Sequence, residues 1–524
     1  MRNQVLHIFR KDVRQHWAEL VLSVAIIVAY AWREVAKFKG SEDTSYDILL
    51  PDMLRNLVVV VWAFLILRVV QAESLVGDRQ FWVTRPYEWK KLLAAKLLFV
   101  VVFVNVPLFI LQVFLLLKAG FPLTSHVSGL LWLQLLWILI LILPVATLAT
   151  VTKSIGQFMM AILSVLLYFA ILFPALEKLV PPAASVPVEN PIPGWLELLA
   201  VVGAGLTVVL WQYARRRTAQ SRVLLLGAAV AAPVIMLVTP YRILIERTYR
   251  PATTRQQLPV QLVFDPAKLG SREGNRPEKN KVRVRIPLLV SGIEDGDIVD
   301  IGGSTVSIQP PAGRPWSSGW HRSGVLLPHR QHDQEDVTID EGFFERVKSV
   351  PVKIRVSFAL APAHTREMVR VVAQATQFAM PGEGRCSYSP RFQGEIVCAF
   401  PLKTPAFLMS AKSDELTCAK QQKEPLLPPG TTLYGGNLWS RGSGPADFGL
   451  NPVQTTSLGF WDWGETSDRN HRPRVCPGTP LTFFTNWEDL QRIRSDLEID
   501  GIHLADYKLN DVLGGANGFG IMLP

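Results

Sequence analysis

The run LLFVVVFVNVPLFILQVFLLL at residues 97–117 decides the fold class of this chain. A bilayer core is about 30 Å thick, and an apolar helix of roughly 20 residues spans it. The run has that length, and other apolar runs of similar length precede and follow it before residue 245. Residues 246–524 contain no such run. We therefore expect an α-helical membrane bundle over residues 1–245 and a water-soluble domain over residues 246–524.

The predicted bundle has about seven spans. They lie at about 17–35, 55–72, 97–117, 128–150, 157–174, 195–213 and 222–241. Because AYA at 29–31 is typical of a cleavage site, the first span could also be a signal peptide. The charged segment before it is long and more spans follow, which favours an uncleaved anchor.

Basic residues predict the orientation of the bundle. They concentrate at the amino end, between the second and third spans, and in YARRRTAQSR at 213–222. The positive-inside rule places these segments in the cytoplasm. With seven spans, the carboxyl domain is then extracytoplasmic, and the chain is a multi-pass protein of the cell (inner) membrane. The last span contains Pro233 and Pro240; if it does not cross, the carboxyl domain is cytoplasmic.

Few polar residues interrupt the predicted spans. The candidate intramembrane polar residues are Asn105, Gln112 and Gln134. Polar groups inside lipid either mark a functional site or join neighbouring helices by hydrogen bonds. No row of acidic residues crosses the bundle, which argues against a proton-driven pump. We expect kinks where a proline removes a backbone donor, at Pro107, Pro144 and Pro233.

One segment between the second and third spans carries the functional signal. It reads ESLVGDRQFWVTRPYEWKKLLAAKLLFVVVF, residues 73–103. An acidic and polar stretch leads to Phe81 and Trp82, a turn follows at Thr84–Pro86, and a short amphipathic helix over about 88–95 continues into the third span. A helix on the membrane surface that continues into a span is suited to transmit a push from a cytoplasmic partner.

This segment resembles the cytoplasmic loop of type-2 ABC transporter permeases, the membrane subunits of many exporters. The resemblance is close over residues 73–98 and loose over residues 1–215. It implies coupling to an ATPase through Phe81, Trp82, Arg85, Pro86, Trp89, Lys90 and Leu92. The alternative is an interfacial helix with an aromatic anchor and no partner. Such permeases usually have six spans, whereas a seventh is predicted here.

The chain contains no phosphate-binding G-x-x-x-x-G-K-[ST] pattern. The resemblance therefore implies that ATP binds to a separate ATPase subunit, and that this chain carries no cofactor of its own. It also implies a dimer of two membrane halves, formed with a second copy or a sister permease. The net charge of +10 is explained by topogenic residues, and no motif predicts a nucleic-acid partner.

The carboxyl domain is predicted to be mostly β, as a β-sandwich or jelly roll. Short apolar or alternating runs recur between Gly and Pro turns. The clearest run is KVRVRIPLLV at 281–290, in which Val282, Val284 and Ile286 face one side of a strand. Other predicted strands are 258–265, 304–310, 350–360, 480–487 and 498–509, while 366–374 could be a helix or a strand.

All four cysteines lie in this domain. An even number of cysteines confined to it fits an oxidising, periplasmic compartment. We expect the pairs Cys386–Cys398 and Cys418–Cys476, although four cysteines permit three pairings. A zinc site would need closely spaced cysteine pairs, which are absent. The histidines and acids at 329–336 are interpreted as a solvated loop, so no metal site is predicted.

Three functions were compared. The favoured one is the membrane-spanning subunit of an ABC exporter, without catalytic residues of its own. The alternative is a membrane-anchored extracytoplasmic binding or scaffold protein without transport activity. A membrane enzyme with an outer active site is the third, and neither G-x-S-x-G nor H-E-x-x-H supports it.

Overall fold

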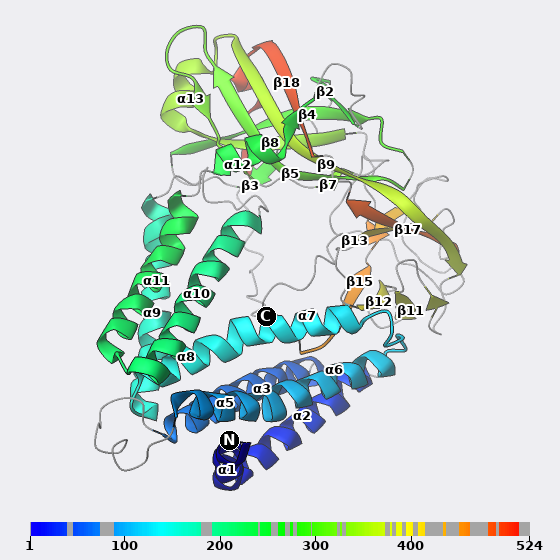
Figure 1. Ribbon diagram of the computed structural model, residues 1–524. Coiled ribbons are helices and arrows are strands. Elements are labelled where there is room, and N and C mark those ends of the chain that lie inside the picture. The colour runs from blue at the N-terminus through cyan, green and yellow to red at the C-terminus, as the bar shows by residue number, and fades with distance from the viewer. Residues whose placement is uncertain are drawn as a thin grey trace.

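The computed structural model has a helical amino-terminal half and a carboxyl-terminal half built mostly of strands (Figure 1). It describes residues 2–38, 46–73, 88–179, 191–238, 241–252, 260–267, 273–275, 280–294, 296–321, 325–326, 332–372, 378–379, 384–389, 395–401, 407–413, 433–435, 450–458, 460–461, 480–488 and 492–512.

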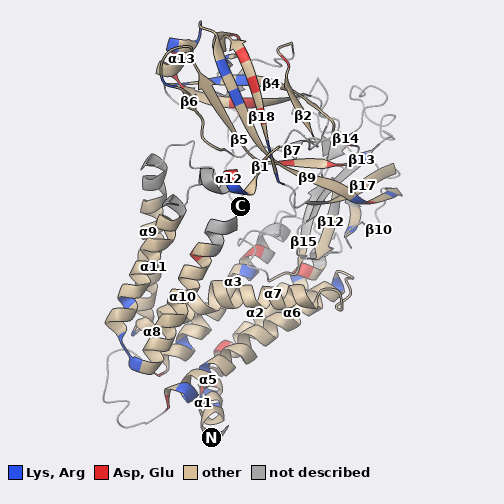
Figure 2. Ribbon diagram, turned by 45° about the horizontal axis from the view of Figure 1, so that its top comes forward, with Lys and Arg blue, Asp and Glu red and all other residues tan. Residues whose placement is uncertain are grey.

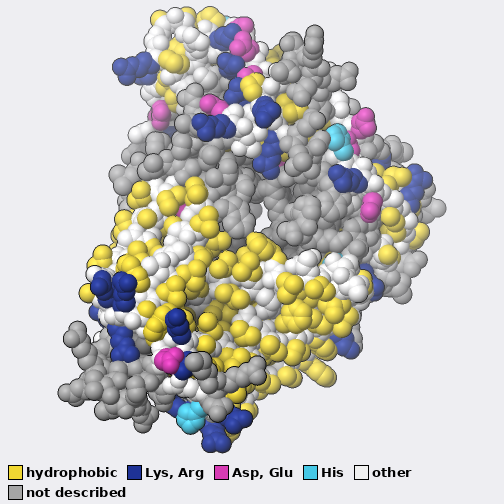
Figure 3. Space-filling view, in the orientation of Figure 1, with side chains coloured by type: hydrophobic (Ala, Val, Ile, Leu, Met, Phe, Trp, Pro, Cys, Tyr) yellow, Lys and Arg dark blue, Asp and Glu magenta, His cyan; other side chains and the backbone are white. Residues whose placement is uncertain are grey.

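The helical half begins with a short helix and continues with long ones. In chain order they are α1 (Arg2–Gln15), α2 (Trp17–Phe38), α3 (Tyr46–Gln71), α5 (Trp89–Val100), η1 (Val101–Asn105), α6 (Val106–Lys118), α7 (Val127–Trp137), η2 (Ile138–Ile142), α8 (Leu143–Val151), α9 (Ile155–Leu179), α10 (Pro191–Arg215), α11 (Thr218–Val238) and α12 (Tyr241–Thr248). On the face seen in Figure 3, the surface of these helices is broadly hydrophobic.

Six helices among the described residues are long and apolar enough to cross a membrane. They are Asp52–Gln71, Trp89–Lys118, Val127–Val151, Ile155–Leu172, Leu196–Arg215 and Thr218–Ile235. Each of them matches a predicted span, and together they indicate a membrane protein. The first predicted span forms the 22-residue helix α2, which also carries Glu19, Arg33, Glu34 and Lys37.

Helix α2 nevertheless presents an apolar face to the outside of the bundle. Trp17 is 65% exposed and Trp32 is 78% exposed, with exposed Val21, Val24 and Val28 between them. The two tryptophans are separated by about 22 Å at the helical rise of 1.5 Å per residue.

Two of the predicted proline kinks coincide with π-helical turns. Pro107 follows η1 and Pro144 follows η2. A proline ring clashes with the carbonyl of the residue four positions earlier, which here lies inside each π turn. The wider turn accommodates that clash and lets α5, η1 and α6 run on as one helix. Pro233 lies inside α11.

The described residues of the strand-rich half form one large sheet and three small ones. Its elements are β1 (Arg250–Pro251), β2 (Gln261–Phe264), β3 (Glu273–Asn275), β4 (Lys281–Ser291), β5 (Ile298–Gln309), β6 (Trp316–Ser317), β7 (Val325–Leu326), β8 (His332–Asp340), α13 (Glu341–Val347), β9 (Val352–Val372), β10 (Phe378–Ala379), β11 (Arg385–Ser389), β12 (Glu395–Pro401), β13 (Phe407–Ser413), β14 (Leu433–Gly435), β15 (Val453–Leu458), β16 (Phe460–Trp461), β17 (Pro480–Glu488), β18 (Ile493–Ile502), a 3₁₀ turn (Leu504–Tyr507) and β19 (Asn510–Val512).

The core of this half lies between two sheets. Sheet β2-β4-β8 and the β5, β9 and β18 part of the large sheet contribute side chains to one hydrophobic cluster, which α13 also covers. The alternation predicted for β4 is confirmed, since Val282, Val284 and Ile286 are all buried in it. On the other face, Arg285 forms a bidentate ion pair with Asp336 of β8, with N–O distances of 2.7 and 2.8 Å.

Strand β9 connects two parts of the large sheet. Its first half pairs with β5 and β18, and its second half pairs with β17. Residues 366–372, for which a helix was also possible, are therefore a strand. The expectation of a loop at 329–336 is wrong for residues 332–336, which belong to β8 and pair with β4. At 498–509, strand β18 ends at Ile502 and a 3₁₀ turn follows.

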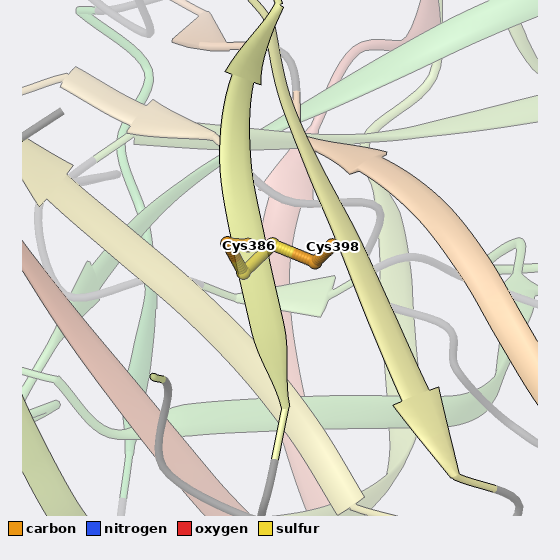
Figure 4. Close-up of a disulfide and its surroundings, with 2 residues drawn as sticks. All are labelled: Cys386 and Cys398. Carbon is orange, nitrogen blue, oxygen red and sulfur yellow. A yellow bond between two sulfur atoms is a disulfide. The ribbon is translucent and has the colours of Figure 1, made fainter. Parts of the chain in front are cut away.

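The disulfide Cys386–Cys398 is confirmed and joins neighbouring strands β11 and β12 (Figure 4). These strands belong to the sheet β10-β11-β12-β15, named the stapled sheet below. Both cysteines are buried. The predicted pair Cys418–Cys476 lies outside the described residues.

Candidate functional site at the foot of the bundle

The ends of several membrane helices are fastened together at one end of the bundle. This end, called the foot, comprises α1, the carboxyl end of α3, the start of α5, the end of α8 and the α10–α11 turn. The Gln71 amide of α3 donates to the hydroxyl of Thr152 at 3.0 Å. The Arg222 guanidinium of α11 donates to the carbonyl of Val151 at 2.9 Å. Lys and Arg residues gather at this end of the ribbon (Figure 2).

A buried cluster of four charged side chains lies within the foot. Lys96 of α5 contacts both Asp12 of α1, at 2.8 Å, and Glu73, which follows α3. Lys11 contacts the other oxygen of Glu73 at 2.5 Å. Asp12, Glu73 and Lys96 are buried, whereas Lys11 is about one-third exposed. Two cations and two anions make the cluster, named the foot ion cluster, formally neutral.

Burial and pairing act in opposite directions on the two carboxyl groups. Burial raises the pKa of Asp12 above its ordinary value, because desolvation outweighs the attraction of Lys96. Burial also acts to raise the pKa of Glu73, but Lys96 and Lys11 together lower it below its ordinary value. Both acids therefore depend on their lysines. Removing one partner of such a buried pair leaves an uncompensated charge, which is strongly destabilising.

The foot ion cluster fixes both attachment points of the segment that resembles a permease coupling loop. Glu73 is the first residue of that segment, and α5 begins at Trp89 at its other end. Lys96, two turns into α5, binds Glu73 directly. Leu92 is buried in the same bundle core that α1, α2 and α3 share. Glu73 and the start of α5, which border the intervening chain, therefore both lie beside the foot ion cluster.

The predicted coupling residues fall into two groups. Phe81, Trp82, Arg85 and Pro86 lie outside the described residues. The others lie on the first turn of α5, where Trp89 is half-buried, Lys90 is exposed and Leu92 is buried. The Lys90 ammonium lies 5.7 Å from the Trp89 ring. Leu92 can therefore act only by positioning α5, while Lys90 is available at the surface.

The polar residues predicted inside the membrane form one connected chain of amides. Asn105 in η1 donates to Gln134 of α7 at 3.1 Å, and Gln134 donates to Gln112 of α6 at 2.9 Å. Of the two alternatives for these residues, the structure shows hydrogen bonds between neighbouring helices. These bonds tie the long α5–η1–α6 helix to α7 across the hydrocarbon region.

The foot ion cluster itself was missed by sequence reasoning. In the sequence, Asp12 is only the single acid in a basic amino end, and Lys96 only a cation just before the third span. A usable signal existed, because Glu73 and Lys96 each border a long apolar run. Charged residues at such positions are expensive unless they are paired.

A second polar cluster lies inside the strand-rich half. Glu335 of β8 is buried and accepts hydrogen bonds from Ser304 at 2.7 Å and from His321 at 2.6 Å. In a hydrolytic triad the acid and the serine contact opposite nitrogens of the histidine ring. Here the same ring nitrogen, Nε2, faces both, and Ser304 is fully buried, so this geometry does not form a triad.

Among the residues that the structure describes, no group of three or more His, Cys, Asp and Glu side chains is arranged to hold a metal ion. No protein-family model matches the chain, and no curated protein matches it.

Proposed function

We propose that this chain is the membrane-spanning subunit of an ABC transporter, and that it works as an exporter with a separate ATPase. The observation that carries the proposal is the foot ion cluster, which anchors both ends of the coupling-type segment. An ATPase can move a membrane helix only if the segment that it contacts is firmly attached to that helix. Lys96 and Glu73 provide that attachment directly beside α5.

The proposed orientation places the foot in the cytoplasm. Lys and Arg residues gather at the foot, and the positive-inside rule favours the cytoplasmic side for them. The helical half would lie in the inner membrane. With α2 as a seventh span, the strand-rich half is then extracytoplasmic. A buried disulfide in that half is compatible with an oxidising compartment.

The proposed contact surface for the ATPase is the segment from Phe81 to Lys90. Phe81 and Trp82 would insert as apolar groups into a groove of the ATPase, while Arg85 and Lys90 would form polar contacts around them. Pro86 would shape the turn and Trp89 would brace it. Two membrane halves complete such a transporter, so a second copy or a sister permease would be the other partner, and ATP would bind on the ATPase.

The test is an affinity purification of the tagged chain from gently solubilised membranes, followed by mass spectrometry. We expect an ABC ATPase with the wild-type chain and its loss with Phe81→Ala/Trp82→Ala. Trp32→Ala is the matched control, because Trp32 is a 78% exposed aromatic residue at the end of α2 away from the foot. That variant should retain the ATPase.

The alternative outcome is equally informative. If a folded wild-type chain brings down no ABC ATPase, the permease proposal is wrong. The chain would then be a membrane-anchored binding or scaffold protein, and its strand-rich half would be the place to search for a ligand.

A further inference from the structure

One uninterrupted helix joins the two ends of the bundle. Helices α5, η1 and α6 run together from Trp89 to Lys118, a stretch of 30 residues. At 1.5 Å per residue this helix is about 45 Å long. It begins at the foot ion cluster and ends at the turn that leads to α7. The helix over residues 89–118 is named the rod below.

An arginine of the stapled sheet contacts the turn at the outer end of the rod. The guanidinium of Arg385 in β11 lies 5.8 Å from the centre of the Phe121 ring. It also covers Gly120, where a β-carbon would overlap it. Gly120 has a φ of +86°, a conformation that favours glycine. The turn that caps the rod therefore lies directly against the side chain of Arg385, which is otherwise exposed.

Apolar packing adds a second contact between the stapled sheet and the outer ends of α6 and α7. Val453 of β15 is buried in one cluster with Leu116, Phe121 and Leu130 from the ends of α6 and α7. Beside it, Asn451 donates to Glu34 near the end of α2 at 2.9 Å. The disulfide joins β11, which carries Arg385, to β12, which pairs with β15. The two contacts therefore belong to one cross-linked sheet.

We propose that the rod mechanically links the foot to the stapled sheet, so that displacement of the coupling segment changes the strand-rich half through Arg385. The chain of contacts is continuous. Lys96 fixes the inner end of the rod, the amides of Asn105 and Gln112 hold it beside α7, and Gly120 and Phe121 hold Arg385 at its outer end. The role of an ATPase as the driving partner rests on the proposed function, whereas the mechanical link does not.

The test is hydrogen–deuterium exchange of the full chain in lipid nanodiscs, read in peptides that cover β11 and β12. One arm adds the ATPase recovered by affinity purification. The other arm needs no partner and uses Lys11→Gln, which loosens the foot at its most exposed member. Each arm is run with the native Arg385 and with Arg385→Ala. Arg355→Ala is the matched control, because Arg355 is an exposed arginine on β9.

With Arg385 present, we expect each perturbation of the foot to change exchange in β11 and β12 at least twofold. The change should disappear with Arg385→Ala and persist with Arg355→Ala, while peptides of β5 stay constant throughout. Gly120→Ala, which displaces the guanidinium without removing it, should act like Arg385→Ala.

The two ideas can fail separately. If the ATPase protects no peptide that covers residues 81–90, the proposed function fails, and the Lys11→Gln arm still decides the link. If β11 and β12 do not respond to Lys11→Gln, or respond equally with Arg385→Ala, the mechanical link is wrong.

Discussion

Replacing Lys96 with methionine is the sharpest test of the foot ion cluster. Methionine keeps the length of the side chain but removes the cation between Asp12 and Glu73. Breaking a buried ion pair costs about 3–5 kcal/mol, because it leaves an uncompensated charge. Lys11 can still pair with Glu73, so Asp12 is the carboxylate left without a lysine. We therefore expect a loss in this range rather than twice as large.

The assay is the free energy of unfolding of the detergent-solubilised chain in an SDS titration. Lys90→Met is the control, since Lys90 lies on the same helix but is exposed, and it should change stability by less than about 0.5 kcal/mol. In Lys96→Met/Asp12→Asn the orphaned charge is removed, so the double variant should recover much of the loss. Additive effects of the two substitutions, or equal effects of Lys96→Met and Lys90→Met, would refute the reasoning.

Three further predictions concern other parts of the fold. The pKa of His321 is raised above its ordinary value because its bonds to Glu335 outweigh the opposing effect of burial. His321 thus stabilises the strand-rich half fully below its unfolded pKa of about 6.5, and this stabilisation is lost as pH rises through its folded pKa. The melting temperatures at pH 5.5 and pH 8.5 should therefore differ less in His321→Gln than in the wild type. Gly205→Val should cost about 1–3 kcal/mol in SDS unfolding, since a β-carbon there would lie 3.2 Å from a side chain of α8, whereas Gly203→Val should be neutral. Cys386→Ser/Cys398→Ser should lower the stability of the strand-rich half by about 2–4 kcal/mol, measured by denaturant unfolding; an unchanged midpoint would contradict a structural role for the disulfide.

The elements that sequence could predict are those set by local composition. Span length follows from bilayer thickness, and six predicted spans correspond to apolar helices in the structure. The alternation of Val282, Val284 and Ile286 predicted a strand with one buried face, because side chains alternate along a strand. Cys386 and Cys398 were paired correctly since a short intervening segment could fold back as a hairpin.

The features that sequence could not predict depend on distant partners. Asp12 and Lys96 are 84 residues apart, and nothing local to either one identifies the other. Residues 332–336 of β8 lack the apolar alternation of a strand, because Glu335, on the core-facing side, is an acid rather than an apolar residue. Its burial is explained only by Ser304 and His321 from elsewhere in the fold.

The bond between Glu34 and Asn451 also sets an order of events during synthesis. These residues are 417 positions apart in the chain, yet they join the end of α2 to the strand-rich half. At about 5–20 residues per second, a ribosome needs about 20–80 s to pass from one to the other. Helix α2 is therefore complete for that whole interval before Asn451, its partner in the strand-rich half, is synthesised. Translation pauses or truncations before Asn451 would leave the first helix of the bundle without its contact to the last-made domain.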